Sequence, residues 1–154
     1  MLRLVGLHLI GLRIMTDKLL QKLARMYDDI YTDKPYKRTK TVAFLVCRGK
    51  IVSFGINSDK TSPMQNKYRL LTSKRDIKNF FDKEHAEICC LRKVDHEFRF
   101  DRCELVVISK MISGDFRLAR PCETCMKAVK DFGNAEKLLV DLFTQNTEET
   151  LFTI

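Results

Sequence analysis

The chain has little of what repetitive, disordered or membrane-spanning proteins need. Its 154 residues include six glycines and three prolines, too few for a collagen-like or low-complexity chain. No apolar run approaches the roughly 20 residues of a transmembrane helix, so we expect no association with a membrane. A composition that is 45% hydrophobic and 31% charged is typical of globular proteins. The length suits one domain with a full core.

Tryptophan is absent and aromatic residues make up only 9% of the chain. Few side chains are therefore left for stacking on nucleic-acid bases, and the candidates are Tyr36, Tyr68 and Phe116. The charge has the opposite implication, because a net charge of +8 favours anionic partners such as nucleotides, nucleic acid or phosphate. A basic surface that is simply solvated accounts for the same charge.

The six cysteines have neither the chain length nor the spacing of a disulfide framework. Two of them belong to a motif described below. The other four, Cys47, Cys89, Cys90 and Cys103, lie in apolar surroundings. This usage favours a reducing, intracellular setting, and we expect the protein to be cytoplasmic.

The first 14 residues are apolar apart from two arginines, and no small-residue cleavage site follows them. Met15 stands just before a helix that Thr16 or Asp17 can cap. We interpret residues 1–14 as an N-terminal extension, or as sequence upstream of the natural start. Residues 15–154 are predicted to form a single domain.

Hydrophobic periodicity predicts an α/β protein with α-β-α layers. The predicted helices are 16–31, 85–96 and 122–132, and the predicted strands are 41–47, 50–54, 103–112, 137–143 and 150–154. Arg48-Gly49 is a tight-hairpin signal. The connection 144–149 is too short for a parallel crossover, so the last two strands should be antiparallel. The expected sheet is five-stranded and mixed, with helices on both faces.

Two polar segments, 57–83 and 114–120, are predicted to be loops. The first is basic and lacks a clear period. Loops of that length inside a compact domain are usually functional.

Two short motifs each stand at the start of a predicted helix: His85-Ala86-Glu87 and Pro121-Cys122-Glu123-Thr124-Cys125. Cys122 and Cys125, at positions i and i+3, share a helix face, and the helix N-terminus favours their thiolates. With His85 they make three ligands and leave a fourth position for water, the pattern of a catalytic Zn²⁺. Zinc would turn that water into a hydroxide near neutral pH, and Glu87 would carry its protons.

The same cysteines are compatible with different kinds of site. A CxxC motif alone is often redox-active or part of a structural zinc site. A structural site needs a fourth ligand, and His8 and His96 stand in unrelated segments. Cys89 and Cys90 share a predicted helix with His85, which leaves a rearranged site open, although a place in the core suits both.

The spacing H-x-E…P-C-x-x-C is the known signature of zinc nucleobase deaminases. Over most of residues 41–143 the chain resembles the cytidine deaminase superfamily. The stretches FGINSDKTSPMQNKYR (54–69), HAEICCL and ARPCETCMKAVKDFG are similar to a group of phage and bacterial deaminase-like proteins. The resemblance implies one zinc ion on His85, Cys122 and Cys125, with Glu87 as the proton shuttle.

The same resemblance implies that Asn57 hydrogen-bonds the substrate sugar and that Phe54 and Gly55 wall the base pocket. Plain strand packing is the alternative for Phe54 and Gly55, and the sequence favours it. The chain also departs from the family. Ser62 stands where the common form of the segment has histidine, and Glu123 is acidic where many relatives carry a small residue or proline. The F-x-x-N-x-E-N pattern typical of free-nucleoside enzymes is missing.

Three functions are compatible with these residues. The first is hydrolytic deamination of cytosine in a nucleoside or nucleotide, with Lys60, Lys67 and Arg69 as candidates for binding a 5′-phosphate. The second is deamination of cytosine or adenine in single-stranded DNA or RNA. The third is a non-catalytic, zinc-stabilised binding module. The superfamily that the chain resembles commonly forms dimers or tetramers, so a homo-oligomer is compatible with the resemblance, and the sequence does not give the oligomeric state.

Overall fold

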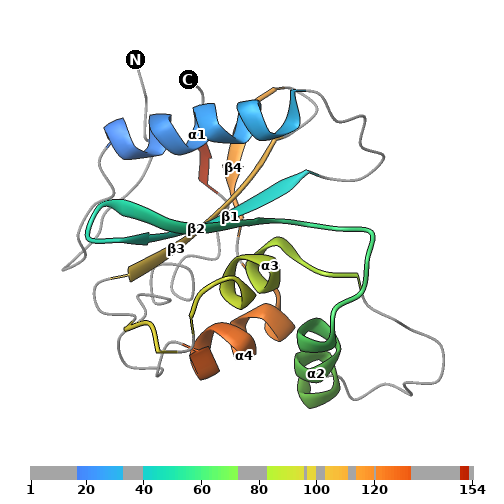
Figure 1. The fold of residues 1–154 in the computed structure, drawn as a ribbon. Coiled ribbons are helices and arrows are strands. Elements are labelled where there is room, and N and C mark those ends of the chain that lie inside the picture. Colours follow the sequence, from blue (N-terminus) through green and yellow to red (C-terminus); the bar gives the residue numbers. More distant parts are fainter. Residues whose placement is uncertain are drawn as a thin grey trace.

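The structure is a computed structural model that describes residues 17–32, 40–72, 83–95, 97–99, 103–110, 114–119, 121–132 and 150–152. The helices are α1 (Asp17–Tyr31), α2 (Pro63–Thr72), α3 (Ala86–Arg92) and α4 (Glu123–Phe132). The strands are β1 (Thr41–Cys47), β2 (Lys50–Ile56), β3 (Cys103–Lys110), β4 (Phe116–Leu118) and β5 (Thr150–Phe152). Figure 1 shows α1 on one face of an antiparallel sheet and α2, α3 and α4 on the other.

The sheet is organised around β1, which pairs with β2 on one side and β3 on the other. Every residue from Val42 to Val46 is buried, because successive side chains of a strand point to opposite faces and both faces here are covered. Val42, Phe44 and Val46 pack toward α1, whereas Ala43 and Leu45 belong to the core under the other helices. β1 therefore contributes side chains to both cores, one on each face of the sheet.

One core lies between the sheet and α1. The buried residues of α1 recur at helical spacing: Leu20, Leu23, Ala24, Tyr27 and Tyr31. The two tyrosines also anchor the helix to the chain entering β1, since Tyr27 Oη donates to the Lys40 carbonyl at 2.8 Å and Tyr31 Oη to the Thr41 carbonyl at 2.9 Å. The helix predicted over 16–31 is thus present and amphipathic as expected.

The second core lies between the sheet and helices α3 and α4. It includes Ile88 and Leu91 from α3 with Cys125, Ala128 and Val129 from α4. α3 approaches β2 so closely that a Cβ placed on Gly55 would overlap the backbone of Ala86 and Cys90. This close packing places the start of α3 against the sheet.

The hairpin between β1 and β2 is confirmed. Arg48 and Gly49 both have positive φ, 52° and 77°, as a two-residue hairpin turn of the favoured twist requires. The predicted helices at 85–96 and 122–132 and the strand at 103–112 are also present, with ends that differ by a few residues.

The prediction of a loop over 57–83 is wrong for its middle part, which is the helix α2. Ser62 caps this helix, because its Oγ accepts the N–H of Gln65 at 3.1 Å, and Pro63 occupies the first helical position, where its missing N–H costs nothing. Met64 and Tyr68, four residues apart, face the core. Only a few apolar residues form the inward face of α2, so the sequence of this segment shows no clear helical periodicity.

The expected loop at 114–120 is also wrong, because β4 pairs antiparallel with β3 there. All strand pairs that the structure describes are antiparallel, so the expected mixed sheet is not seen. The strand predicted at 137–143, and with it the antiparallel arrangement of the last two strands, lies outside the described residues. The predicted set of five strands is therefore not confirmed, although the short β5 pairs with β4.

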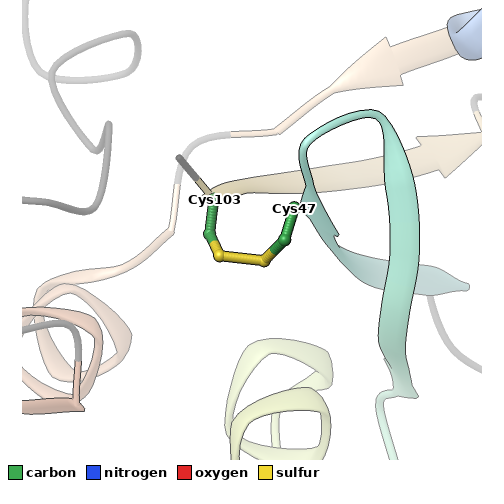
Figure 2. The surroundings of a disulfide bond; sticks show 2 residues. All are labelled: Cys47 and Cys103. Carbon is green, nitrogen blue, oxygen red and sulfur yellow. A yellow bond between two sulfur atoms is a disulfide. The ribbon is translucent and has the colours of Figure 1, made fainter. Parts of the chain in front are cut away.

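One disulfide joins Cys47 to Cys103, from the end of β1 to the start of β3 (Figure 2). The two residues are direct partners in the antiparallel register, with their Cα atoms 4.0 Å apart. The sequence contained no signal for this pair, because the cysteines are separated by 56 positions and only the strand register makes them neighbours. Cys89, Cys90, Cys122 and Cys125 are not disulfide-bonded.

Within the described residues, no helix has both the length and the apolar character needed to cross a membrane. The N-terminal segment 1–14 lies outside the described residues.

Candidate metal centre

His85 stands immediately before α3, with extended backbone angles of φ −78° and ψ 155°. The preceding chain is tied to the segment after β2: the Ser58 N–H donates to the Glu84 carbonyl at 3.0 Å, and the Glu84 N–H donates to the Lys60 carbonyl at 2.9 Å. The Cys89 N–H then closes the first helical turn onto the His85 carbonyl at 3.0 Å. His85 is therefore held between a paired segment and a helix.

The two motif cysteines come from the start of α4. The Met126 N–H donates to the Cys122 carbonyl at 2.8 Å, so helical bonding begins at Cys122, and Cys125 lies one turn further along the same face. Pro121 is buried just before them. Cys125 is buried and Cys122 is exposed, so the pair reaches from the interior to the surface.

The structure brings His85, Cys122 and Cys125 together. His85 Nδ1 lies 3.4 Å from each of the two Sγ atoms, and the three ligand atoms all lie within 4.8 Å of one another. Zinc bonds of about 2.0 Å to nitrogen and 2.3 Å to sulfur, at tetrahedral angles, would place such atoms about 3.5 Å apart. One nitrogen and two sulfurs are also the ligand types that zinc prefers. The three residues fit one zinc ion.

The two thiols differ in acidity. Hydrogen bonding to Cys125, and then to His85, lowers the pKa of the Cys122 thiol to about 4. The pKa of Cys125 is raised, first by its hydrogen bond to Cys122 and then by burial. The lowered pKa of Cys122 favours its thiolate, which is the form of cysteine that would bind zinc.

Glu87 lies in the first turn of α3 and is only 6% exposed. Burial, and then the charge of Cys122, raises the pKa of its carboxyl group, while its own backbone N–H, His85 and a hydrogen bond with Cys125 act in the opposite direction. A raised pKa brings the carboxyl group closer to the range in which it can both accept and donate a proton near neutral pH. Its contact with Cys125 places it beside the three ligands.

Asn57 lies just after β2, and its side chain is bonded to the protein. Its Oδ1 accepts the Thr41 N–H at 3.0 Å and, at 3.2 Å, shares the single proton of the Tyr31 hydroxyl with the Thr41 carbonyl. These two bonds fix the orientation of the side-chain amide. Asn57 is also next to Ser58, whose N–H donates to the carbonyl of Glu84, the residue before His85. The backbone around Asn57 is therefore bonded to the segment that carries the histidine ligand.

The two residues expected to wall the base pocket are in different surroundings. Gly55 is buried under the backbone of α3. Phe54 is 38% exposed and its ring lies 6.3 Å from that of Phe44, a residue of the α1 core. Lys93 Nζ lies 5.1 Å above the Phe54 ring. The metal ligands belong to α3 and α4 on the other face, so the structure does not bring Phe54 to them.

The three basic candidates are also separated. Lys60 is exposed, and its carbonyl group is bonded to Glu84, next to His85. Lys67 and Arg69 lie on α2 instead, and Lys67 Nζ lies 5.3 Å from the centre of the Tyr68 ring. Lys60 is thus tied most directly to the ligand segment.

The described candidates for base stacking are core residues. Tyr68 is 3% exposed and Phe116 is 2% exposed, so neither offers a ring face to a nucleic acid. Tyr36 lies outside the described residues. The expectation that Tyr68 or Phe116 stacks on bases is wrong, because helical and strand positions turn both inward.

Two residues beside the centre were not among the predicted site residues, although Gln65 stands in the stretch 54–69 that carries the resemblance. Gln65 is fully buried and its Oε1 accepts the His85 N–H at 3.0 Å. Glu84 is 4% exposed and receives two bonds from Arg92, at 2.5 and 3.1 Å. A Ser-Pro helix start three residues before Gln65 was the available signal for α2, and Glu84 offered none beyond standing next to His85.

Comparison with known proteins gives one match. Residues 16–141 match the family model described as the cytidine and deoxycytidylate deaminase zinc-binding region. No curated protein and no solved structure matches the chain.

Proposed function

Since the chain belongs to the cytidine and deoxycytidylate deaminase family, we propose that it is a zinc-dependent enzyme that removes the amino group of cytosine in a nucleoside or nucleotide. The observation that carries the proposal is the convergence of His85 Nδ1 with the sulfurs of Cys122 and Cys125, beside the buried Glu87. A structural zinc site would complete its tetrahedron with a fourth protein ligand. Among the described residues, no further histidine, cysteine, aspartate or glutamate joins these three as a fourth ligand.

His85, Cys122 and Cys125 would hold the zinc ion, which would supply Lewis-acid activation of a water molecule. The protein's own contribution is proton transfer and positioning. Glu87 accepts a proton as the nucleophile forms and delivers protons to the ring nitrogen and the departing ammonia. Its buried position favours this cycle, because the raised pKa of its carboxyl group lets it hold a proton between steps.

A nucleoside or nucleotide fits this surface better than a polynucleotide. Two of the three aromatic residues that the sequence offered as candidates for stacking, Tyr68 and Phe116, are buried. Asn57, whose amide is fixed by Thr41 and Tyr31, is our candidate for holding the sugar. Lys60, exposed and next to the ligand segment, is our candidate for a 5′-phosphate.

Ammonia release measured with the zinc-loaded protein tests the proposal. The panel contains cytidine, dCMP and dCTP, their adenine counterparts, and cytosine-containing oligonucleotides. We expect turnover of a cytosine nucleoside or nucleotide. Glu87→Gln should still bind one zinc ion per chain, but its rate should be lower by about 10²–10⁴-fold, the usual contribution of general acid–base catalysis. Turnover of oligonucleotides alone would replace this proposal with the polynucleotide alternative, and a wild-type rate in Glu87→Gln would refute the mechanism.

The role of Lys60 has its own comparison. Lys60→Ala should raise KM for dCMP while leaving KM for cytidine unchanged, because only dCMP carries the phosphate. The control variant is Lys22→Ala, which makes the same change in net charge: Lys22 is an exposed residue of α1, the helix on the face of the sheet opposite to α2, α3 and α4 (Figure 1). Equal effects of both variants on dCMP would show that the net charge acts, and not a phosphate contact.

A further inference from the structure

We propose that Gln65 is a positioning residue of the metal centre: its side-chain carbonyl holds the main-chain N–H of His85 and so sets the direction of the histidine ligand. The inference rests on the proposed zinc-dependent function and deepens it. It assigns a role to α2, the helix inside the segment that was expected to be a loop.

The burial of Gln65 is the first observation. Its side chain is a primary amide with 0% exposure in the protein interior. Burying such a group costs free energy unless it is hydrogen-bonded, so the partners of a buried glutamine indicate its role. The partner of its Oε1 is the N–H of His85, at 3.0 Å, on the backbone of a metal ligand.

The second observation is the backbone around His85. His85 is the residue before the first turn of α3, and its own side chain makes no capping bond there. It is needed for the metal instead. The peptide group before His85 is therefore held from outside the helix, and Gln65 supplies that contact. Fixing this peptide group limits rotation about the backbone bonds from which the imidazole ring projects.

The third observation is that α2 contacts both elements that carry the ligands, α3 and α4. Gln65 is fixed at its base, because its N–H donates to Ser62 Oγ. One turn later Tyr68 lies in the same core cluster as Cys125, and α2 packs on α4. One turn of α2, at Tyr68, thus packs in the core that contains Cys125, and the preceding turn, at Gln65, is bonded to His85. The helix ties the positions of the ligands to each other.

Through the backbone, Ser58, Lys60 and Thr61 pair with residues 83 and 84, which come directly before His85. The side chain of Gln65 continues this contact to residue 85 itself. The carbonyl group of Gln65 is therefore the specific feature to test.

Zinc affinity is the direct measurement, made by competition with a chromophoric chelator and without substrate. Gln65→Met keeps the length of the side chain but removes the acceptor, and Gln65→Glu keeps an acceptor. Tyr68→Phe, which removes a hydroxyl from the same helix without touching His85, is the matched control. Contacts behind a metal ligand typically contribute about 10–100-fold to metal affinity. We expect a loss of that size in Gln65→Met, and zinc affinity within about threefold of wild type in the other two variants.

A second readout separates positioning from general stability. Cobalt in place of zinc gives visible absorption bands that report ligand geometry. These bands should change in Gln65→Met and stay the same in Tyr68→Phe, at matched thermal stability. If Gln65→Met does not fold, Gln65→Asn takes its place, because the shorter amide withdraws its carbonyl from His85.

The proposal is overturned if folded Gln65→Met, or Gln65→Asn in its place, binds zinc as tightly as the wild type, or if Tyr68→Phe loses as much affinity. It is also overturned if Gln65→Glu fails to retain the metal. These outcomes do not depend on turnover. A wild-type protein that binds zinc but releases no ammonia would refute the proposed function while leaving the role of Gln65 measurable.

Discussion

Replacing Gly55 with alanine tests the close approach of α3 to β2. A Cβ at this position would lie 2.8 Å from the carbonyl carbon of Cys89 and closer still to the Ala86 oxygen and the Cys90 nitrogen. All three are backbone atoms of α3, which cannot move aside by rotating a side chain. The backbone at Gly55 does not have positive φ, so alanine adds no conformational strain there. The whole effect is steric.

The expected magnitude follows from these distances. Ordinary contact begins at 3.4 Å, so the helix would have to retreat by more than 0.6 Å. Overpacking costs about 1–3 kcal/mol, and a helix backbone that must shift as a unit places this variant at about 3 kcal/mol. For a chain of this size the melting temperature should fall by about 6–12 °C. His85 moves with α3, and misplacement by about 1 Å can lower a rate by about 10²-fold.

The assay is thermal unfolding followed by circular dichroism, with zinc content and ammonia release measured on the folded variant. Gly49→Ala is the control. A Cβ there meets nothing within 4 Å, but φ is +77°, so only backbone strain of about 1–2 kcal/mol is expected. If Gly55→Ala melts at the wild-type temperature, or above Gly49→Ala, the close packing of α3 on β2 is wrong.

Three further predictions concern thiols and one ion pair. In the metal-free protein, iodoacetamide should alkylate Cys122 at a rate that is constant from pH 5 to 8 and falls below pH 4, because a pKa of about 4 keeps the thiol ionised above that pH. Peptide mass spectrometry measures the alkylation and should show that zinc protects Cys122. A rate that rises steadily up to pH 8 would contradict the lowered pKa. The denatured, metal-free protein should expose four thiols before reduction and six after it. Reducing Cys47–Cys103, whose partners are separated by 56 positions, should lower the free energy of unfolding by about 4 kcal/mol, and six thiols before reduction would refute the bond. Arg92→Ala should lower the free energy of unfolding, measured in urea, by about 1–2 kcal/mol, because the Glu84 carboxylate loses this partner; the value is low because the arginine side chain is 47% exposed. Arg92→Lys should restore only part of this stability, since lysine cannot make two parallel bonds to a carboxylate. Unchanged stability in Arg92→Ala would show that the ion pair contributes nothing.

Most helices and strands were predictable because their signals are local. The stripe of α1, the hairpin at Arg48-Gly49 and the buried run of β3 each arise from neighbouring residues. The two missed elements had weak local signals. α2 presents few apolar residues to the core, and β4 has only three residues, too few to show a period. Its strand conformation depends on pairing with β3.

The candidate site divides in the same way. Cys122 and Cys125 meet because both stand at the start of one helix, at a spacing that any helix would bring together. His85 joins them only through the packing of α3 against β2 and α4. The candidates around the site were less predictable: Phe54 and Gly55 are adjacent in the chain, but one is partly exposed on an edge strand and the other is covered by a helix.

The residue types and spacing of His85, Cys122 and Cys125 were enough to predict a zinc ligand set, and the place of Glu87 two residues after the histidine was enough to propose a proton carrier, because both belong to one short signature. The tertiary structure decided what positions that chemistry. The bond from Gln65 to His85 and the pairing of Cys47 with Cys103 depend on helix packing and strand register, which arise from contacts between residues far apart in the chain. Residue type and local spacing carry no record of such contacts.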